Sequence, residues 1–472
     1  MTKSTTTTTS KKTSPSVAMV TPCFMGRDGV GNTIRDYLQA LATWQWETHL
    51  YHSHRGLSVA GLTDHCIDMG SLLLEVMEDK KCSFFDFDYY VYQYVFHYPL
   101  LETIRTLNKG RVIVEYHGIT PPHFFPQEDP YHEKANDILA RHELLDYADG
   151  VVVHSHSMKK ELLQLHSVPA ERVHVLPLGV DGRYSAGPPK KDIREKYAPH
   201  GEKLLLYVGR LSGNKNATEL IEGLALLPKE TKCSLILLGA HERTTTPLYL
   251  QEIEKKIREL GLSQSVHLVD QVSDEELPGF YRSTDLFVTA SLHEGFCIPV
   301  AEAMSCGTPC VVPNFSATPE TMGEGGLTYE AHSAKDLAQK IMQALDEKEQ
   351  KILQEKALKT SAKYSPEAFQ ERLKSLFHAV SKQERRLRPP LSQRAAILKA
   401  SANADFYYDD LSPKTLVGEF IRWFRRKLTL PLEVSMVRKQ RDRQRLVNEM
   451  LTDELQNIQK EVSELRSQLD KH

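Results

Sequence analysis

Short apolar runs alternate with stretches of helical periodicity along most of this 472-residue chain. Because each run precedes an amphipathic stretch, the pattern predicts parallel strands joined by crossover helices. A segment rich in Gly, Pro and Lys, 181–202, divides the series in two. The sequence therefore predicts an α/β protein with two doubly wound, Rossmann-like domains that face a cleft. The expected strands are 17–21, 48–52, 89–96, 111–115, 150–153, 173–176, 204–208, 234–239, 266–269 and 285–290. Helical stretches such as 132–147 and 158–165 separate the strands.

Composition narrows the class of protein. The formal net charge is −3, and 40% of the residues are hydrophobic, so the chain has no overall bias toward nucleic acid. Seven scattered cysteines form no C-x-x-C pair and no metal-ligand spacing, which favours a reducing cytoplasm and predicts no metal site. The sequence contains no run of about 18 apolar residues, so we expect any membrane contact to be peripheral.

The strongest functional signal is the segment 291–307, in which seven residues separate two glutamates. An apolar strand precedes the segment, and Pro299 and Gly307 frame a short helix. Free amides at a helix start favour an anion and paired carboxylates suit hydroxyl groups, so a nucleotide sugar fits both, although a solvated surface is the alternative. The groups expected at the carboxyl edge of the sheet are Glu294, the backbone amides of Gly295 and Phe296, and Glu302 on the helix.

A glycine-rich loop follows the first strand. Its residues Gly29 and Gly31 would let backbone amides approach a phosphate or sugar, ahead of a helix expected over 33–44 with Asn32 as its N-cap. A dinucleotide site is disfavoured because Ile34 occupies the third glycine position. A simple tight turn is the other interpretation.

Three more side chains follow strand ends. Arg210 and Lys215 lie in the loop after strand 204–208 and just before a helix, an arrangement suited to a diphosphate. His117 falls where strand 111–115 stops, so we expect its ring to point into the cleft. Surface solvation for the cations and a structural role for the histidine are the alternatives.

Together these motifs closely resemble the retaining family-4 glycosyltransferases, which have the GT-B fold. Cys297 is a departure, because many members have Gly there; the side chain is small, so we expect little effect on backbone approach. The strings that carry the resemblance are 115–122, 176–181, the G-R-x4-K element at 209–215, the E-x7-E element within 291–307, and 317–326. The resemblance implies that Glu294 contacts the transferred sugar, Glu302 holds the ribose hydroxyls, and Arg210 and Lys215 bind the donor phosphates. Gly29 and Gly31 would face the donor diphosphate and sugar across the cleft, and His117 would touch the sugar's primary hydroxyl.

The resemblance implies a hexosyltransferase that uses a GDP- or UDP-sugar donor and a glycan or lipid-linked acceptor in polysaccharide synthesis, with no cofactor and no metal. The N-terminal domain, 17–180, would face the acceptor, and the C-terminal domain, 203–363, would bind the nucleotide sugar. The D-x-D string 86–88 is discounted as a metal site because it precedes a strand. A phosphorylase, a sugar-phosphate synthase or a nucleotide-sugar epimerase of the same fold is an alternative, as is a noncatalytic scaffold.

The remaining segments extend this core. We expect a disordered leader over 1–16 and a basic amphipathic extension over 381–445. Between them in the chain, a crossover helix over 364–380, with Ser365 as its N-cap and Pro at its first position, would return to the N-terminal domain. Within that extension, basic residues interleaved with large apolar ones over 411–445 predict either peripheral contact with anionic lipid or docking on the catalytic domains. Leucine-type residues at heptad spacing predict a coiled coil over 446–472, which would pair with its own copy or a pathway partner.

Overall fold

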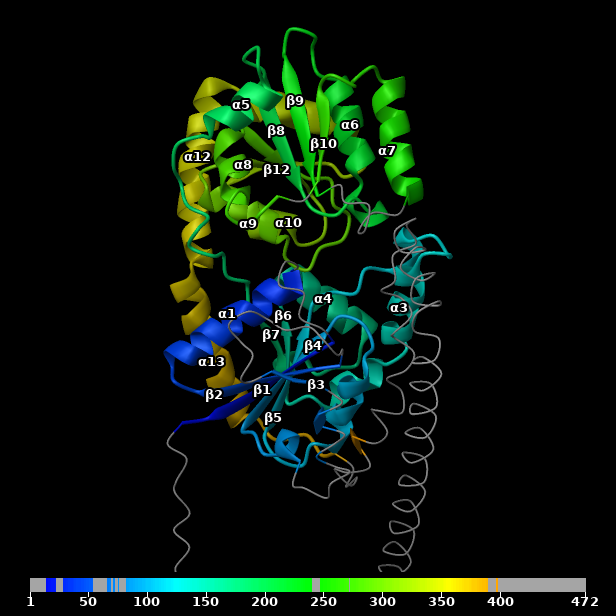
Figure 1. Cartoon of the computed structure of the whole chain (residues 1–472), viewed down its shortest axis with the longest axis vertical. Helices are drawn as coiled ribbons and strands as arrows, with labels where there is room; N and C mark the ends of the chain where they lie inside the picture. Colours follow the sequence, from blue (N-terminus) through cyan, green and yellow to red (C-terminus); the bar gives the residue numbers. More distant parts are fainter. Residues whose placement is uncertain are drawn as a thin grey trace, which may run out of the picture.

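The computed structural model of the chain describes residues 14–22, 29–53, 66–68, 71–72, 75, 82–239, 247–270, 272–388 and 396–397. These residues form two α/β domains, drawn one above the other in Figure 1. Residues 23–28, which include the first part of the glycine-rich loop, lie outside the described residues. So do nearly all of the leader and the predicted membrane and coiled-coil segments over 411–472.

The N-terminal domain contains a seven-stranded sheet in the order β3-β2-β1-β4-β5-β6-β7, and every pairing is parallel. Its strands are β1 (Ser16–Thr21), β2 (Glu47–His52), β3 (Cys66–Asp68), β4 (Tyr89–Tyr94), β5 (Arg111–Tyr116), β6 (Gly150–Val153) and β7 (Val173–Val175). Its α-helices are α1 (Gly29–Thr43), α3 (Pro130–Leu139) and α4 (His156–Leu165), and its 3-10 segments are η2 (Ser83–Phe85), η3 (Pro99–Thr106), η4 (Pro122–Phe124), η5 (His142–Tyr147) and η6 (Ala170–Arg172).

The C-terminal domain contains a six-stranded parallel sheet in the order β10-β9-β8-β11-β12-β13. Its strands are β8 (Lys203–Val208), β9 (Cys233–Leu238), β10 (Val266–Val269), β11 (Leu286–Val288), β12 (Cys310–Pro313) and β13 (Gly326–Tyr329). Its helical elements are α5 (Lys191–Tyr197), η7 (Gly213–Lys215), α6 (Ala217–Ala225), α7 (Pro247–Glu259), α8 (Leu277–Ser283), α9 (Ile298–Ser305), α10 (Thr318–Met322), α11 (Ala334–Ala344), α12 (Glu347–Ser361) and η8 (Ala362–Tyr364). The prediction of two doubly wound parallel sheets is confirmed.

The central strands are apolar on both faces because helices cover both sides of each sheet. All six residues of β1 are buried, and α13 (Pro366–Lys382) returns from the C-terminal domain to pack beside α1 (Figure 1). Phe369 and Phe377 of α13 belong to the same buried apolar cluster as Val17 and Met19 of β1. The Ser365 hydroxyl accepts a hydrogen bond from the Ala368 amide, so the N-cap predicted from the sequence is confirmed.

Two helix boundaries differ from the prediction. Helix α1 begins at Gly29, so Asn32 lies inside the first turn and is not the N-cap. The Asn32 side chain accepts a hydrogen bond from the Arg35 guanidinium at 3.0 Å, so its polar partner lies within the helix. The helix expected over 132–147 ends at Leu139, and its second half forms η5. It begins earlier than expected because Asp129 caps it, with its side chain accepting from the Tyr131 amide.

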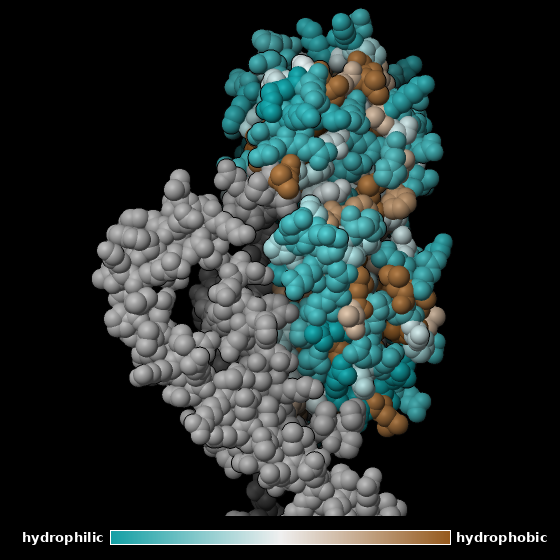
Figure 2. Space-filling view, turned by 90° about the vertical axis from the view of Figure 1, so that its right-hand side faces the viewer, coloured by the Kyte–Doolittle hydropathy of each residue, from teal (hydrophilic) through white to brown (hydrophobic). Residues whose placement is uncertain are grey.

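The first described residues beyond α13 bind the N-terminal domain. The segment 383–388 crosses the amino edge of the sheet, where Arg111 donates to the Gln383 carbonyl oxygen at 2.6 Å. Ala396 and Ile397 are buried in the same domain. This part of the predicted basic extension therefore docks on the protein. Within the described residues no helix is both long and apolar enough to cross a membrane. The face drawn in Figure 2 is mainly hydrophilic, with apolar residues in small separate groups.

Candidate functional site

The predicted donor-side residues meet where strand order reverses in the C-terminal sheet. Strands β8 and β11 are neighbours there, although β9 and β10 lie between them along the chain. The loop after β8 carries Arg210 and Lys215, and the loop after β11 carries Glu294. The Leu292 amide donates to the Asn214 carbonyl oxygen at 2.7 Å and ties the loops together. Ligands of open α/β sheets bind at such a position.

Lys215 and Glu294 form an ion pair at the centre of this site. The Lys215 ammonium donates to Glu294 Oε1 at 2.5 Å, and the two side chains are 18% and 14% exposed. Burial alone would raise the pKa of Glu294, but the Lys215 charge and the hydrogen bonds to the carboxylate hold it below its usual range. The site therefore contains one fixed cation and one fixed carboxylate that solvent reaches.

Arg210 adds a second cation. Its guanidinium carbon lies 5.2 Å from the ring centroid of Tyr131, which belongs to the N-terminal domain. The backbone around it is held by the Tyr207 hydroxyl, which donates to the Arg210 carbonyl oxygen at 2.9 Å. Arg210 is exposed and forms no ion pair within the described residues, so its charge is available to an anion.

Glu302 lies on α9, the helix that follows the Glu294 loop. It is 6% exposed, and Glu302 Oε2 accepts a hydrogen bond from the Tyr281 hydroxyl at 2.7 Å. Burial raises the pKa of Glu302 to about 7, although hydrogen bonds from Tyr281 and Tyr184 oppose that rise. The carboxyl group can therefore exchange a proton near neutral pH, and its two phenol partners were missed by the sequence analysis.

The turn that follows Glu294 depends on one glycine. A side chain on Gly295 would place a Cβ 2.7 Å from the His117 carbonyl oxygen, so only glycine fits against the N-terminal domain. Phe296 is buried and packs edge-on against Tyr364, with ring centroids 5.1 Å apart. The Phe296 side chain therefore fixes the turn from the core side.

The expectation that Cys297 has little effect on backbone approach leaves out a conformational cost. Cys297 adopts φ +70°, the left-handed region in which a Cβ meets the following carbonyl group. Glycine avoids that cost, and cysteine does not. The residue nevertheless holds this conformation at the start of α9, where it is 6% exposed.

His117 follows β5 as predicted, but its ring is not free to enter a cleft. Nε2 lies 2.6 Å from Gln93 Oε1, and Nδ1 lies 3.3 Å from His154 Nε2. Burial, and then the neighbouring His154, keep the pKa of His117 well below its usual range. The position of His117 at the strand end was predicted, but these long-range partners were not. The group of His117 that abuts Gly295 is the backbone carbonyl.

Gly29 and Gly31 lie in the first turn of α1 and not in a loop, which corrects the prediction. A Cβ on Gly29 would lie 3.8 Å from Ile298 Cδ1 of α9. The start of α1 therefore faces the helix that carries Glu302. The Thr33 hydroxyl donates to the Gly29 carbonyl oxygen at 2.8 Å and stabilises this turn.

Three further contacts join the domains around the site. The Ser155 hydroxyl donates to the Gly295 carbonyl oxygen at 2.9 Å. His293 Nε2 lies 3.1 Å from Glu161 Oε1 of α4. The Glu320 carboxylate accepts from the backbone amides of His156 and Ser157 at 2.8 and 3.1 Å, so it caps α4 from the other domain. These residues were not among the predicted site residues, although Ser155 and His156 follow β6 in the same way that His117 follows β5.

The discounted D-x-D string is structural in its contacts. Asp88 accepts hydrogen bonds from the Ser16 amide and hydroxyl at 2.8 and 3.0 Å, and Asp86 lies 3.5 Å from the Lys109 ammonium on the surface. In the part of the chain that the structure describes, no group of three or more side chains is arranged to ligate a metal ion.

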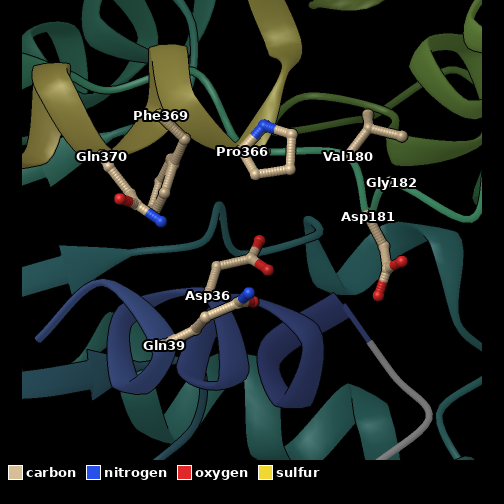
Figure 3. Close-up of a pocket in the computed structure, with 9 residues that line it drawn as sticks. Asp36, Gln39, Val180, Asp181, Gly182, Pro366, Phe369 and Gln370 are labelled. Atoms are coloured by element: carbon tan, nitrogen blue, oxygen red, sulfur yellow. The ribbon is translucent and has the colours of Figure 1, made fainter. Parts of the chain in front are cut away.

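A separate cavity of about 80 Å³ lies at the crossover between the domains (Figure 3). Asp36 and Gln39 of α1, Asp181 of the crossover and Phe369 of α13 line it. Burial, and then the charge of Asp181, raise the pKa of Asp36 to about 7. The cavity does not include any of the predicted site residues.

Comparison with known proteins places these features in a family. Residues 27–183 match Glycosyltransferase Family 4, and residues 189–363 match Glycosyl transferases group 1. The chain belongs to the family-4 glycosyltransferases. The two matches cover both domains of this glycosyltransferase and contain all the predicted site residues.

Curated relatives of this glycosyltransferase match over part of their length. O-antigen chain mannosyltransferase B of Escherichia coli is 29% identical over 261 residues, which cover 54% of this chain and 66% of the relative. Mannosylfructose-phosphate synthase of Agrobacterium fabrum is 31% identical over 180 residues, 36% of this chain and 39% of the relative. The chain thus spans less than two thirds of each.

Solved structures share the GT-B fold with this glycosyltransferase. Sucrose-phosphate synthase from Thermosynechococcus elongatus has a TM-score of 0.63 at 20% identity, and covers 78% of this chain and 99% of its own. Anabaena Alr3699/HepE in complex with UDP has a TM-score of 0.60 at 17% identity, with coverages of 77% and 100%. At these identities the likeness shows the fold alone.

Proposed function

We propose that the protein is a retaining hexosyltransferase that moves a mannose- or glucose-type hexose from a GDP- or UDP-sugar to a glycan or lipid-linked glycan in the synthesis of a cell-surface polysaccharide. Membership of the family supports the reaction class. The mannosyltransferase name of the Escherichia coli relative supports the sugar and the pathway.

One observation carries the proposal: Arg210 and the Lys215–Glu294 pair occupy the switch point of the C-terminal sheet, and Glu302 lies on the helix that follows the Glu294 loop. A nucleotide diphosphate sugar has an anionic centre between two hydroxyl-rich sugars. In our proposal Arg210 and Lys215 bind the diphosphate, Glu294 orients the transferred hexose and Glu302 binds the ribose. The ligand phosphate would replace Glu294 as the partner of Lys215, which leaves the carboxylate for sugar hydroxyls.

The chemistry follows from where charge develops. As the bond between the anomeric carbon and the phosphate oxygen breaks, negative charge grows on the departing diphosphate. Arg210 and Lys215 stabilise that charge because they are already held in place by the protein. In the proposed reaction the departing phosphate accepts the proton of the acceptor hydroxyl on the same face, which retains the anomeric configuration. Glu294 fixes the hexose for that approach.

Donor binding and product release test the function together. We expect one nucleotide sugar from a panel to raise the unfolding temperature, because a ligand that binds only the folded state stabilises it. With that donor and a polysaccharide acceptor, free nucleoside diphosphate must appear in step with the glycosylated product. Turnover of the donor to an isomer without any acceptor would instead identify an epimerase, and a requirement for free phosphate would identify a phosphorylase.

A sugar-phosphate synthase is the second candidate, and one contact favours it. The amides of His156 and Ser157 bind the Glu320 carboxylate, so this point of the acceptor-side domain binds an anion. A phosphorylated acceptor sugar could occupy the same amides if Glu320 moved away. The name of the Agrobacterium fabrum relative supports this class of acceptor. Transfer to a hexose phosphate in preference to an unphosphorylated glycan would decide in favour of the synthase.

We also propose that the enzyme works peripherally at a membrane through 411–445 and associates through 446–472. The basic and apolar composition of 411–445 supports the first part, and the heptad spacing supports the second. Cosedimentation with vesicles that contain anionic lipid, compared with neutral vesicles, tests the membrane contact. Removal of residues from Leu451 onward must change the oligomeric state while activity on a soluble acceptor persists.

A further inference from the structure

Four polar side chains form a connected chain behind the end of β5; Gln93, Glu115 and His154 are buried, and His117 is partly buried. Gln93 and Glu115 are register partners on β4 and β5, and Gln93 Nε2 donates to Glu115 Oε2 at 2.8 Å. On its other side Gln93 Oε1 lies 2.6 Å from His117 Nε2. His117 Nδ1 lies 3.3 Å from His154 Nε2, and His154 Nδ1 lies 3.1 Å from the Leu176 carbonyl oxygen. The chain thus runs from the core to the junction between the domains.

Counting hydrogen atoms limits the protonation states that these four side chains can adopt. The Leu176 carbonyl only accepts, so His154 Nδ1 carries a hydrogen. A neutral imidazole carries one hydrogen, so His154 Nε2 is an acceptor and His117 Nδ1 must donate to it. The ring of a neutral His117 then has a bare Nε2, which needs a donor from Gln93. That donor is present if the Gln93 amide is turned by 180°, which exchanges its oxygen and nitrogen.

Two arrangements satisfy every contact. In the first, Glu115 is ionised and His117 is a cation with hydrogens on both nitrogens. In the second, Glu115 is protonated and donates to the Gln93 oxygen, the Gln93 nitrogen donates to His117 Nε2, and all four side chains are neutral. Both arrangements hold the same number of hydrogens; they differ in the position of one proton and in the orientation of the Gln93 amide.

Burial selects the neutral arrangement. Glu115 and Gln93 are completely buried, and His154 is 2% exposed. Burial raises the pKa of Glu115 to about 7, while burial lowers the pKa of His117 well below its usual range. An ion pair made from these two groups would place the Glu115 charge fully out of water and the His117 charge partly so, which costs more than leaving the proton on Glu115.

We propose that Glu115 is a positioning residue whose proton, passed through the Gln93 amide, selects the tautomer of His117 and holds the end of β5 against the donor loop. The carbonyl group of His117 abuts Gly295, so the support ends at the loop that contains Glu294. When the Glu115 proton is released to solvent, Gln93 must donate to the carboxylate and present its oxygen to His117. The neutral ring then moves its hydrogen from Nδ1 to Nε2, and the contact with His154 loses its hydrogen.

Other titratable groups act on the same carboxyl. The charge of Asp36 raises the pKa of Glu115 further, whereas the neighbouring Tyr37 phenol lowers it. His154 Nε2 lies 4.0 Å from Glu115 Oε1. Asp36 lies outside the hydrogen-bonded chain and has its own pKa raised to about 7, so it provides a matched control for the titration.

The tautomer of His117 is measurable by NMR of protein labelled with 15N in its histidines, with the His117 signals assigned from their loss in His117→Asn. In the wild-type protein we expect the hydrogen to move from Nδ1 to Nε2 with a midpoint near pH 7. In Glu115→Gln the amide imitates the protonated acid, so His117 must keep the Nδ1 hydrogen across the whole range. This measurement needs no substrate, so it is separate from any failure of the proposed transferase function.

The control variant sharpens the result. Asp36→Asn must keep the switch and lower its midpoint, because it removes a charge that raises the pKa of Glu115. A switch that persists unchanged in Glu115→Gln, or that disappears only in Asp36→Asn, overturns the proposal, as does a wild-type ring that keeps one tautomer across the range. If Glu115→Gln does not fold, Gln93→Met breaks the connection, and a His117 switch that survives it overturns the proposal equally.

The consequence for catalysis rests on the proposed function. We expect the ratio of kcat/KM for Glu115→Gln to that of the wild type to stay near one below pH 7 and to rise by up to about tenfold per pH unit above it. The ratio cancels the titration of Glu302, which both proteins share. The ratio could stay flat with pH while the His117 tautomer changes. Glu115 would then set the tautomer of His117, but that tautomer would not affect transfer, and this result would contradict the positioning role.

Discussion

Two ion pairs lie at opposite edges of the two sheets and differ in their surroundings. Arg388 and Asp149 meet at the amino edge of the N-terminal sheet, with side chains 1% and 0% exposed and 2.7 Å apart. Arg388 also donates to the carbonyl oxygens of Tyr147 and Leu107, and Asp149 accepts from the Val112 and Arg386 amides. Lys215 and Glu294 meet at the carboxyl edge of the C-terminal sheet and remain partly exposed.

The difference separates structural from functional charge. At the amino edge each charged group has several protein partners, so a ligand would find no unsatisfied donor. At the carboxyl edge the pair is partly exposed, and Arg210 of the same loop forms no ion pair among the described residues, so an anion can compete for the cations. Burial and the number of partners, and not the presence of an ion pair, distinguish the two sites.

The largest effect is expected at the amino edge. Arg388→Met leaves the buried Asp149 carboxylate without its cation and should lower the free energy of unfolding by about 3–5 kcal/mol. Donor binding by the folded protein should not change. Urea unfolding with a nucleotide-sugar titration measures both. The matched control is Arg385→Met in the same segment, which loses a single bond to the Asn108 carbonyl oxygen on the surface and should cost far less.

The opposite pattern is expected at the carboxyl edge. Lys215→Ala should lower turnover by roughly 10²–10³-fold, the scale of losing one preorganised electrostatic contact, while stability changes little. Lys191→Ala, which removes a surface lysine that is 89% exposed, controls for loss of a positive charge. Steady-state kinetics with the donor sugar decides the matter. Equal turnover in Lys215→Ala and the wild type would show that the second ion pair is structural like the first.

A smaller effect is expected where the two domains touch. Gly295→Ala places a methyl group 2.7 Å from the His117 carbonyl oxygen, so the domains must separate slightly. We expect kcat/KM to fall by roughly 10–100-fold, because small displacements of reacting groups are costly. Gly182→Ala is the control, since nothing lies within 4 Å of the added atom. Comparable activity of both variants would mean that the contact is dispensable.

The smallest effect concerns the backbone of the donor loop. Cys297 and Cys306 are both buried, but only Cys297 has a positive φ. Substitution by glycine removes a buried thiol at either position, while it relieves the backbone only at Cys297. Urea unfolding should therefore show that Cys297→Gly costs about 1–2 kcal/mol less than Cys306→Gly. Equal losses would contradict the strain assigned to Cys297.

Local patterns were sufficient for the sheets and for the donor side. The apolar run before 291–307 and the run before Arg210 each form a strand, and the carboxyl-edge rule then brings Lys215 and Glu294 together. Pro299 and Gly307 bracket α9 as predicted, because proline and glycine act through their own backbone geometry.

Local patterns were insufficient wherever a partner lies far along the chain. The ring of His117 depends on Gln93 and His154, which are 24 and 37 residues away. The cap on α4 comes from Glu320, more than 160 residues away. The left-handed conformation of Cys297 was missed because cysteine was judged by its size and not by the φ that the turn requires.

Calorimetric titration of nucleoside diphosphates and nucleotide sugars into the wild type, Arg210→Ala and Lys215→Ala tests the central claim most directly. If these cations hold the donor diphosphate, each substitution weakens binding of the preferred nucleoside diphosphate by roughly tenfold or more, the scale of one charge-assisted contact. Arg388→Met binds it like the wild type. Undiminished affinity in folded Arg210→Ala and Lys215→Ala would place the diphosphate elsewhere and contradict the account.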